Sequence, residues 1–290
     1  MILKEKTENN NFYFIAEIGQ NHQGKIDIAK KMVDEIKTIG GVSAIKTAKR
    51  NLDVCLTEEM KRMPYINQNS FGKTYYEHRK KLELSDENFS ELKNYIEKNG
   101  FDFISSFTDI PSLHFLIDLG VKILKIASQR ATDIELLKET AKTKSAIILS
   151  TGMCNLSNVD KAVDVLKDNE LYVLQSTSSY PCSDYDLNLN IISLYKDRYS
   201  GIIDGVGFSG HHTGIAPDIA AYMLGARIFE RHFTLDRAMK GTDHAASLEG
   251  RGLELVTKYL NQVKISIGSS EKRILPCEVD SIRKLRCDFM

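Results

Sequence analysis

The sequence predicts an α/β protein that folds as one (β/α)8 TIM barrel. Short β-type runs alternate with segments of helical period along the chain, and there are eight such runs, which is the strand number of this barrel. The chain of 290 residues is longer than a usual single-core domain but lies within the size range of α/β barrels. No linker, internal repeat or low-complexity tract divides it, so we expect a single domain over residues 1–290.

The predicted strands and helices alternate in register along the chain. The strands lie at residues 12–17, 43–47, 101–106, 122–128, 146–151, 171–176, 205–210 and 227–232. Amphipathic helices are predicted at residues 26–40, 86–98, 110–120, 133–142, 158–168 and 215–226, and a closing helix at residues 250–268. Asp133 and Ser157 are candidate N-cap residues, and Gly41 and Gly120 follow two predicted helix ends.

One connection is too long for a single strand-to-helix unit. Residues 49–84 form an aromatic-rich insertion between the second strand and the helix at residues 86–98. A long insertion at this position in a barrel borders the catalytic rim and usually acts as a lid or a binding loop. A plain surface excursion is the alternative.

Composition limits the classes of partner. Lys plus Arg and Asp plus Glu both number 39, so the formal charge is zero, and the absence of a long basic run argues against nucleic acid and membrane surfaces as partners. Five cysteines without CxxC spacing argue against a disulfide framework and a zinc ribbon, and they indicate a reducing compartment. Neither a signal peptide nor a membrane span is recognisable, so we expect a cytoplasmic protein that acts on small molecules.

Two histidines stand at the ends of neighbouring predicted strands. Because side chains alternate along a strand, Ser209 shares a face with His211, and Glu230 shares a face with His232. A helical segment separates the two strands, so both imidazoles should open at one rim, where they could bind a divalent metal and leave positions for water or substrate. The alternative is that each histidine is an ordinary hydrogen-bonded core or surface residue.

Further polar side chains are predicted at the same rim. Lys46 and Lys125 lie in the middle of apolar strands, where an ammonium group is costly unless an anion neutralises it. Together with Ser and Thr hydroxyls they predict a site for a ligand that carries phosphate or carboxylate. Glu17 ends the first strand and is a candidate base or a contact of metal-bound water, with a structural capping role as the alternative. The other polar rim positions are Asn21, His22, Ser105, Ser106, Ser128, Ser150, Thr151, Ser176, Thr177, Tyr180, Ser209 and Asp243.

Nine motifs, in order along the chain, resemble the sialic acid synthase family. They are IAEIGQNHQG, the strand with Lys46, ISSFTD, LKIAS, ILSTGM, STSSYPC, GFSGHHTG, ERHFTLDR and KGTDHAASLE, and they run from about residue 12 toward the chain end. This family makes N-acetylneuraminate and related nine-carbon acids such as legionaminate and pseudaminate. The resemblance implies a transferase of carbohydrate biosynthesis, serving cell-surface polysaccharide, that condenses phosphoenolpyruvate with the open-chain aldehyde of an aminosugar such as N-acetylmannosamine and releases phosphate.

The resemblance also implies roles for individual residues. His211 and His232 match the metal ligands of the family, for which Mn²⁺ is the expected ion and Mg²⁺ or Co²⁺ are alternatives, and Glu17 matches a catalytic carboxylate. The matches to the phosphoenolpyruvate site are Lys46, Ser106, Lys125, Ser128, Ser150 and Ser209. Tyr180 and Asp243 match acceptor contacts. The implied partners are the two small-molecule substrates, with neither nucleic acid nor membrane, and a homodimer is one candidate assembly.

This sequence departs from the family pattern at four places. Arg130 stands where the family usually has Glu, Ala48 where it has Gln, and Ser178 where it has Asn. Family members also carry a C-terminal antifreeze-like domain, and the chain is expected to lack it because the sequence stops at Met290. Our hypothesis is that Arg130 binds an anionic group on the acceptor; the alternative is that it points away and pairs with Asp133 or Glu135.

Two other functions compete with this interpretation. The first is a condensation of phosphoenolpyruvate with a different sugar aldehyde, such as the phosphosugars that give seven- or eight-carbon 3-deoxy acids, which Arg130 would suit. The second is a non-catalytic barrel that senses a sugar or another metabolite, which the changes at Ala48 and Ser178 would allow. Retention of both histidines, Glu17 and both lysines argues against the second.

Overall fold

A closed parallel β-barrel forms the centre of the protein. The structure, a computed structural model, describes residues 1–286, so Cys287 lies outside the described residues. Within them eight strands are ordered as in the sequence, and β1 pairs with both β2 and β8, which closes the barrel. The strands are β1 (Tyr13–Glu17), β2 (Ala44–Lys49), β3 (Asp102–Phe107), β4 (Ile123–Ile126), β5 (Ala146–Ser150), β6 (Leu171–Ser176), β7 (Gly205–Gly210) and β8 (Ile228–His232). The predicted TIM barrel is confirmed.

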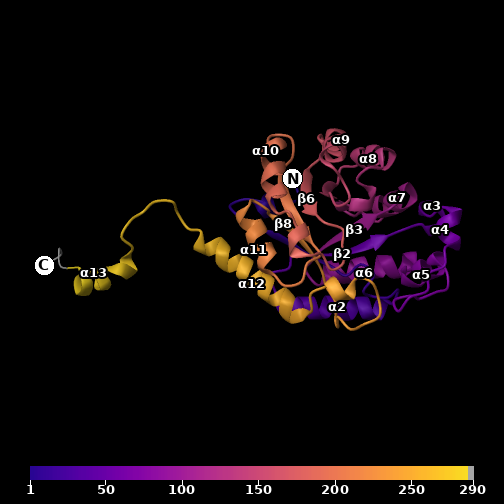
Figure 1. Cartoon of the computed structure of the whole chain (residues 1–290), viewed down its shortest axis with the longest axis horizontal. Coiled ribbons are helices and arrows are strands. Elements are labelled where there is room, and N and C mark those ends of the chain that lie inside the picture. Colours follow the sequence, from indigo (N-terminus) through magenta and orange to yellow (C-terminus); the bar gives the residue numbers. More distant parts are fainter. Residues whose placement is uncertain (287–290) are drawn as a thin grey trace.

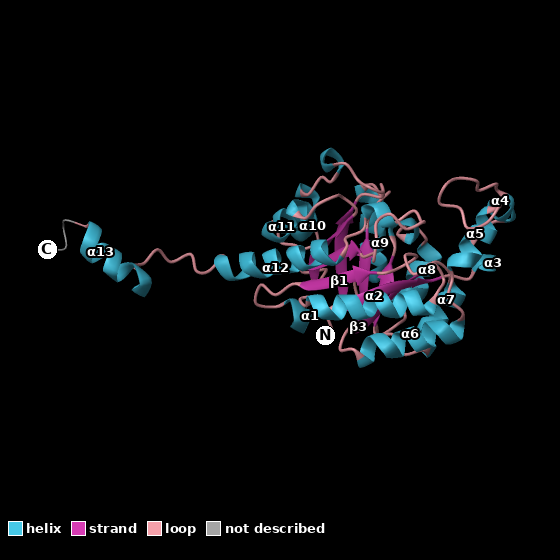
Figure 2. Cartoon of the chain, turned by 90° about the horizontal axis from the view of Figure 1, so that it is seen from below, coloured by secondary structure: helices cyan, strands magenta, loops and turns pink. Residues whose placement is uncertain are grey.

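Helices surround the barrel, as Figures 1 and 2 show. Those between or after strands are α2 (Ile26–Ile39), α6 (Asp86–Lys98), α7 (Ile110–Asp118), α8 (Ile134–Ala141), α9 (Leu156–Leu166), α10 (Asn190–Arg198), α11 (Ala216–Met223) and α12 (Gly250–Ser266). All were predicted except α10, which has no side-chain cap at its start and buries only Ile192 and Tyr195. Its sequence therefore carries a weak signal. None of the helices in residues 1–286 has both the length and the apolar character that a membrane crossing needs.

Helix ends follow local hydrogen bonding. The Asp133 carboxylate accepts from Leu136 N at 3.1 Å and caps α8, as predicted. The cap of α9 is Asn155 rather than Ser157, because the Asn155 side chain accepts from Asn158 N while Asn158 accepts in return from the Asn155 backbone.

Two apolar layers stabilise the barrel. The outer layer lies between the strands and the helices. The inner layer fills the barrel near the strand starts and consists of Leu3, Tyr13, Ile15, Ala44, Ile104, Ile123, Ala146, Ile148, Tyr172, Leu174 and Ile228. Leu3 precedes the short helix α1 (Lys4–Thr7) and is fully buried, while the Glu170 carboxylate accepts from the backbone N–H groups of Ile2, Leu3 and Lys4. The N-terminal segment thus closes this end, and only the C-terminal strand ends remain for a ligand.

The segments that follow β2 and α12 leave the barrel. The insertion folds into α3 (Leu52–Cys55), α4 (Glu58–Arg62) and α5 (Tyr75–Leu82) beside the strand ends. After α12 the chain extends away from the barrel to α13 (Val279–Leu285), as both views show.

Candidate active site

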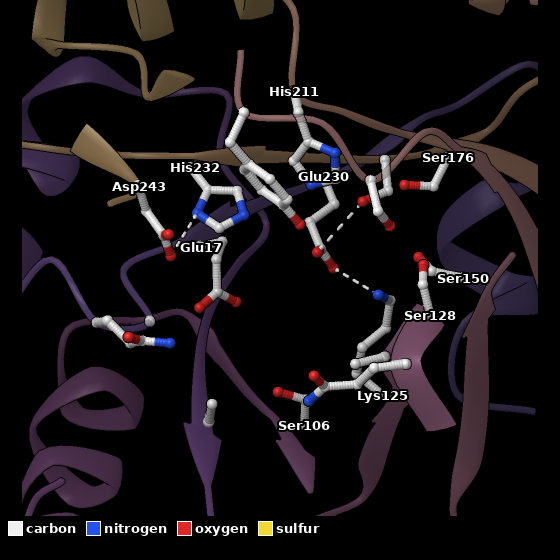
Figure 3. A pocket seen from close by; sticks show the side chains of 18 of the residues that line it. Glu17, Ser106, Lys125, Ser128, Ser150, Ser176, His211, Glu230, His232 and Asp243 are labelled. Atoms are coloured by element: carbon white, nitrogen blue, oxygen red, sulfur yellow. Dashed lines mark hydrogen bonds and ion pairs between the residues drawn. The ribbon is translucent and has the colours of Figure 1, made fainter. Parts of the chain in front are cut away.

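A cavity of about 550 Å³ lies at the C-terminal strand ends, in the size range of small-molecule sites. Every strand contributes a polar side chain to it, because alternate residues point into the barrel. The contributing residues, in strand order, are Glu17, Lys46, Ser106, Lys125, Ser150, Ser176, Ser209, and the pair Glu230 and His232. Figure 3 labels seven of them, all except Lys46 and Ser209, and shows these seven arranged around one central space. The site is therefore a property of the whole barrel.

Four buried charges line the floor of the cavity. Lys46 forms an ion pair with Glu17, and its Nζ lies 3.6 Å from Glu230 Oε1. Lys125 Nζ lies 3.4 Å from Glu230 Oε2. No side chain of the four is more than 7% exposed, so two ammonium groups and two carboxylates compensate one another in a poorly solvated space.

Burial and the neighbouring charges shift the four pKa values differently. Burial raises the pKa of Glu17, and the opposing charges of Lys46 and His232 offset this only in part. Burial also acts on Glu230, but Lys125 and Lys46 outweigh it and lower the pKa of Glu230 to about 2. Burial lowers the pKa of Lys125, whereas Glu17 and Glu230 outweigh burial at Lys46 and raise its pKa. Glu230 is thus a fixed counter-ion, and Glu17 is the carboxylate suited to exchange a proton.

The two predicted imidazoles lie side by side. Their ring centroids are 5.3 Å apart, and the ring of Tyr180 lies 4.2 Å from that of His211. His211 Nδ1 is 2.9 Å from Thr177 O, and since a carbonyl can only accept, Nδ1 carries the proton and Nε2 keeps its lone pair. Burial lowers the pKa of His211 to about 3, which keeps the ring neutral. His232 Nδ1 lies 3.7 Å from Asp243 Oδ2.

Hydroxyl groups occupy the wall opposite His232 and Asp243 (Figure 3). Ser128 Oγ accepts from Gly152 N at 2.9 Å. The hydroxyls of Ser150 and Ser176 are buried and make no hydrogen bond to other residues in 1–286. Gly152 keeps this wall open, because a Cβ there would lie 2.3 Å from Ser178 Oγ. Buried hydroxyls without partners are a feature of ligand sites.

All the residues matched to the family's site line the cavity except Arg130, whereas five further residues predicted at the rim do not line it: Asn21, His22, Ser105, Thr151 and Thr177. Arg130 lines a separate cavity of about 320 Å³, where its Nη1 lies 3.5 Å from Asp133 Oδ2 and its Nη2 donates to Cys55 O at 3.4 Å. This is the second of the two placements considered for it. Ala48 and Ser178, the other side chains that depart from the family pattern, do line the cavity.

Three charged residues that line this cavity were not predicted as site residues from the sequence: Glu230, Arg50 and Arg79. Glu230 shares its strand face with His232, so the period of two already indicated its direction. Arg50 follows β2, and Arg79 lies on α5 of the insertion. No period relates residues of the insertion to the barrel, so their approach to the site had no local signal. The insertion therefore forms part of the cavity wall.

Comparisons with known proteins show which family the chain belongs to. The sequence model of the NeuB family matches residues 32–272. The chain is 38% identical over 275 residues to the N-acetylneuraminate-9-phosphate synthase of Mus musculus, covering 94% of this chain and 76% of the mouse protein. It is 34% identical over 278 residues to the N,N'-diacetyllegionaminic acid synthase of Campylobacter jejuni, covering 94% and 82% of the two chains.

Solved structures give the same relationship. The N-acetylneuraminic acid synthetase of Leptospira borgpetersenii, solved with citrate, superposes with a TM-score of 0.80 at 30% identity and covers 95% of this chain and 92% of that one. A truncated 3-deoxy-D-arabino-heptulosonate 7-phosphate synthase of Thermotoga maritima has a TM-score of 0.65 at 12% identity, which shows the fold alone. The chain belongs to the NeuB family, and it is an enzyme.

Proposed function

We propose that the protein condenses phosphoenolpyruvate with the open-chain aldehyde of an N-acylated aminosugar, giving a nine-carbon 2-keto-3-deoxy acid and phosphate. The observation that carries this proposal is the division of one cavity into two walls. Lys125 and serine hydroxyls suited to an anion lie on one side, and His232 with Glu17 lies on the other, while Lys46 pairs with both Glu17 and Glu230. The names of the relatives, which are synthases of such acids, support the same reaction.

Phosphoenolpyruvate fits the part of the cavity where the two lysines meet the serine hydroxyls. Its phosphate and carboxylate would meet Lys46 and Lys125 together with the hydroxyls of Ser106, Ser128, Ser150 and Ser209. In the free protein the lysines are balanced by Glu17 and Glu230. An arriving anion must therefore compete with the Glu17 and Glu230 carboxylates for the same two ammonium groups. The unbonded hydroxyl of Ser150 is free to donate to it.

The imidazole pair fits a divalent cation such as Mn²⁺. His211 is neutral and directs an unprotonated Nε2 away from Thr177, and the His232 ring lies beside it. In residues 1–286 no group of three or more His, Cys, Asp and Glu side chains is arranged around a common metal position. The protein would thus supply two imidazoles and leave the other positions to water and substrate. Such a cation, when bound, polarises the aldehyde oxygen of the acceptor.

Glu17 is positioned for the proton transfers of the reaction. When C3 of the enol ester bonds to the aldehyde carbon, the aldehyde oxygen takes the proton of the Glu17 carboxyl group and becomes a hydroxyl, and C2 becomes cationic. Water then adds to C2 and returns a proton to the Glu17 carboxylate. The bond from C2 to the phosphate oxygen then breaks, the proton of the C2 hydroxyl leaves with the phosphate, and the 2-keto acid forms. The raised pKa of Glu17, caused by its burial, suits a group that gains and returns a proton.

The test is phosphate release from phosphoenolpyruvate with Mn²⁺ present, measured over a panel of acceptors with the product mass determined alongside. We expect release with an N-acylaminohexose and a product heavier than the acceptor by pyruvate. The His211→Ala variant should lose this activity, whereas His114→Ala should keep it because His114 is exposed and does not line the cavity. Turnover with phosphopentoses alone, or no turnover with any sugar aldehyde, would overturn the proposal.

A further inference from the structure

We propose that Asn21 is a positioning residue of the site, because its side-chain amide fixes the backbone beside His232 and beside Asp243 and so sets the orientation of the His232 imidazole. Asn21 was predicted at the rim, but it does not line the cavity. The inference rests on the proposed function, since it concerns the imidazole pair that would hold the divalent cation. It adds a residue that acts through other residues and touches neither substrate.

The turn that carries Asn21 is tied to the barrel. It follows β1, and Ile18 N donates to Lys46 O of β2 at 2.9 Å. Asn21 N in turn donates to Ile18 O at 3.0 Å. The Asn21 residue is only 2% exposed. These backbone bonds therefore fix the point from which the buried amide starts.

The Asn21 amide donates to two acceptors in the segment after β8. Its Nδ2 lies 2.8 Å from Phe233 O and 2.9 Å from Ser247 Oγ, and both hydrogen bonds are buried. A carbonyl can only accept, so the atom that faces Phe233 O is the amide nitrogen. Both N–H groups of the amide are thus used on one segment of the chain. Their loss would leave buried acceptors without partners.

The first acceptor fixes the backbone next to His232. Phe233 directly follows His232, and its N donates to Glu17 O at 2.8 Å. Leu248 N donates to His232 O at 2.8 Å. The bond from Asn21 to Phe233 O is a further constraint on the same peptide units. Asn21 therefore holds the backbone that carries the His232 imidazole.

The second acceptor continues the hydrogen bonds to Asp243. Ser247 Oγ donates to Asp243 O at 2.7 Å. A hydroxyl has one hydrogen to donate, so Ser247 Oγ accepts from Asn21. Asp243 and Ser247 belong to a loop whose ends lie together, since Phe233 and Leu248 form a parallel bridge. Asn21 thus reaches the backbone of Asp243 through one buried serine.

The two connections meet at the pair of His232 and Asp243. Asp243 Oδ2 lies 3.7 Å from His232 Nδ1, and Figure 3 shows the two side chains together on one side of the cavity. A carboxylate beside Nδ1 favours the ring orientation that leaves Nε2 for a cation. One amide fixes the backbone of both partners, so it also fixes how they face each other. Residues that orient a metal-binding histidine in this way affect metal affinity without contacting the metal.

The experiment measures the Mn²⁺ affinity of the full chain by electron paramagnetic resonance before any substrate is added, with steady-state kinetics on the same preparation. Asn21→Asp keeps the size of the side chain and removes both N–H donors. We expect the Kd for Mn²⁺ to rise about 10- to 100-fold and kcat at a fixed Mn²⁺ concentration to fall. KM for phosphoenolpyruvate should stay within about 2-fold. Ser247→Ala removes only the connection to Asp243 and should give a smaller rise in Kd.

Asn169→Asp is the matched control. Asn169 Nδ2 also donates to two backbone carbonyls, Ala141 O at 3.2 Å and Thr143 O at 3.1 Å, and Asn169 does not line the cavity. This variant loses a similar pair of hydrogen bonds. It should lower the thermal midpoint while leaving the Kd for Mn²⁺ and kcat unchanged, which separates positioning from a general loss of stability.

The outcomes separate this inference from the proposed function. An unchanged Kd for Mn²⁺ in Asn21→Asp, or an equal rise in Asn169→Asp, would refute the positioning role and leave the condensation intact. If circular dichroism shows that Asn21→Asp does not fold, Ser247→Ala decides, and an unchanged Kd there would refute the role. An unchanged protein that neither binds Mn²⁺ nor releases phosphate would contradict the proposed function itself.

Discussion

Two buried charge clusters occupy opposite faces of β8, and they differ in what surrounds them. Glu230 and His232 point into the barrel, toward Lys46 and Lys125, whereas Arg231 between them points outward. Arg231 is fully buried and forms ion pairs and hydrogen bonds with Asp218 of α11 and with His212. The inner cluster, Glu17, Lys46, Lys125 and Glu230, faces the cavity. The outer cluster, Arg231, Asp218 and His212, is enclosed by protein.

The outer cluster fixes the chain next to the imidazole pair. Arg231 Nη2 donates to His212 O at 2.7 Å, and Nη1 donates to Gly214 O at 3.1 Å and to Asp218. His212 directly follows His211, so these bonds hold the backbone that carries the inner imidazole. None of the three side chains of the outer cluster lines the cavity.

The comparison shows that burial alone does not identify a functional charge. Both clusters are almost inaccessible to solvent, and both compensate positive with negative charge. In the outer cluster Arg231 also donates to backbone carbonyls, although its Nε, Asp218 Oδ1 and His212 Nδ1 are buried without hydrogen-bond partners in residues 1–286. In the inner cluster the lysines share two carboxylates beside an open cavity, with unbonded hydroxyls nearby. The first arrangement stabilises the fold, and the second is organised for a ligand.

The largest expected effect is a loss of stability from the outer cluster. Asp218→Asn leaves the Arg231 guanidinium buried without its carboxylate, which should lower the free energy of unfolding by about 3–5 kcal/mol. Urea denaturation followed by circular dichroism measures this. A loss below about 1 kcal/mol would show that the pair of Asp218 and Arg231 does not stabilise the fold.

Lys125→Met should affect activity much more than it affects the free energy of unfolding. Removing one preorganised cation of the inner cluster should lower kcat/KM for phosphoenolpyruvate about 10²- to 10³-fold. The free energy of unfolding should fall by less than in Asp218→Asn, because Lys46 Nζ still lies 3.6 Å from Glu230 Oε1 and continues to compensate that carboxylate. Steady-state kinetics and denaturation on the same preparation test both parts. Strong destabilisation with normal kinetics would reverse the contrast between the clusters.

His22 represents a third case, a buried group that stays neutral. Burial, with Arg50 nearby, lowers the pKa of His22 from 6.5 to about 4, and its Nδ1 accepts from Gly24 N at 3.0 Å. The unfolded chain binds a proton on His22 more readily than the folded chain does. The contribution of His22 to the free energy of unfolding is therefore complete above pH 6.5 and is lost as the pH falls toward 4. The loss should reach about 3 kcal/mol. Unfolding free energies at pH 7 and pH 4.5 measure it, and His22→Gln should show a smaller difference between the two pH values.

The smallest expected effect concerns Ser209, which donates to Glu230 Oε1 at 3.4 Å. Ser209→Ala removes one hydrogen bond that orients the counter-ion of the inner cluster, which should change KM for phosphoenolpyruvate by about 5- to 10-fold, corresponding to about 1 kcal/mol. Thermal denaturation should remain close to that of the unchanged protein. An unchanged KM would mean that Ser209 neither contacts phosphoenolpyruvate nor orients Glu230.

The sequence by itself determined the barrel and most of its site. The period of two placed Glu17, His211 and His232 at the strand ends, and the parallel order of the strands placed those ends at one rim. Lys46 and Lys125 were recognisable because an ammonium group in an apolar strand requires an anion. These properties are local or follow from strand order, so they need no knowledge of side-chain packing.

Only the tertiary structure decided the features that depend on contacts between distant segments. The turn after β4 directs Arg130 toward Asp133 and Cys55, outside the main cavity, while the folded insertion brings Arg79 to it. Glu170 accepts from the backbone of the first residues and fixes Leu3 under the barrel, although the two regions are more than 160 positions apart. Such placements are set by packing and by the compensation of charge in three dimensions, and neither has a periodic signal in the chain.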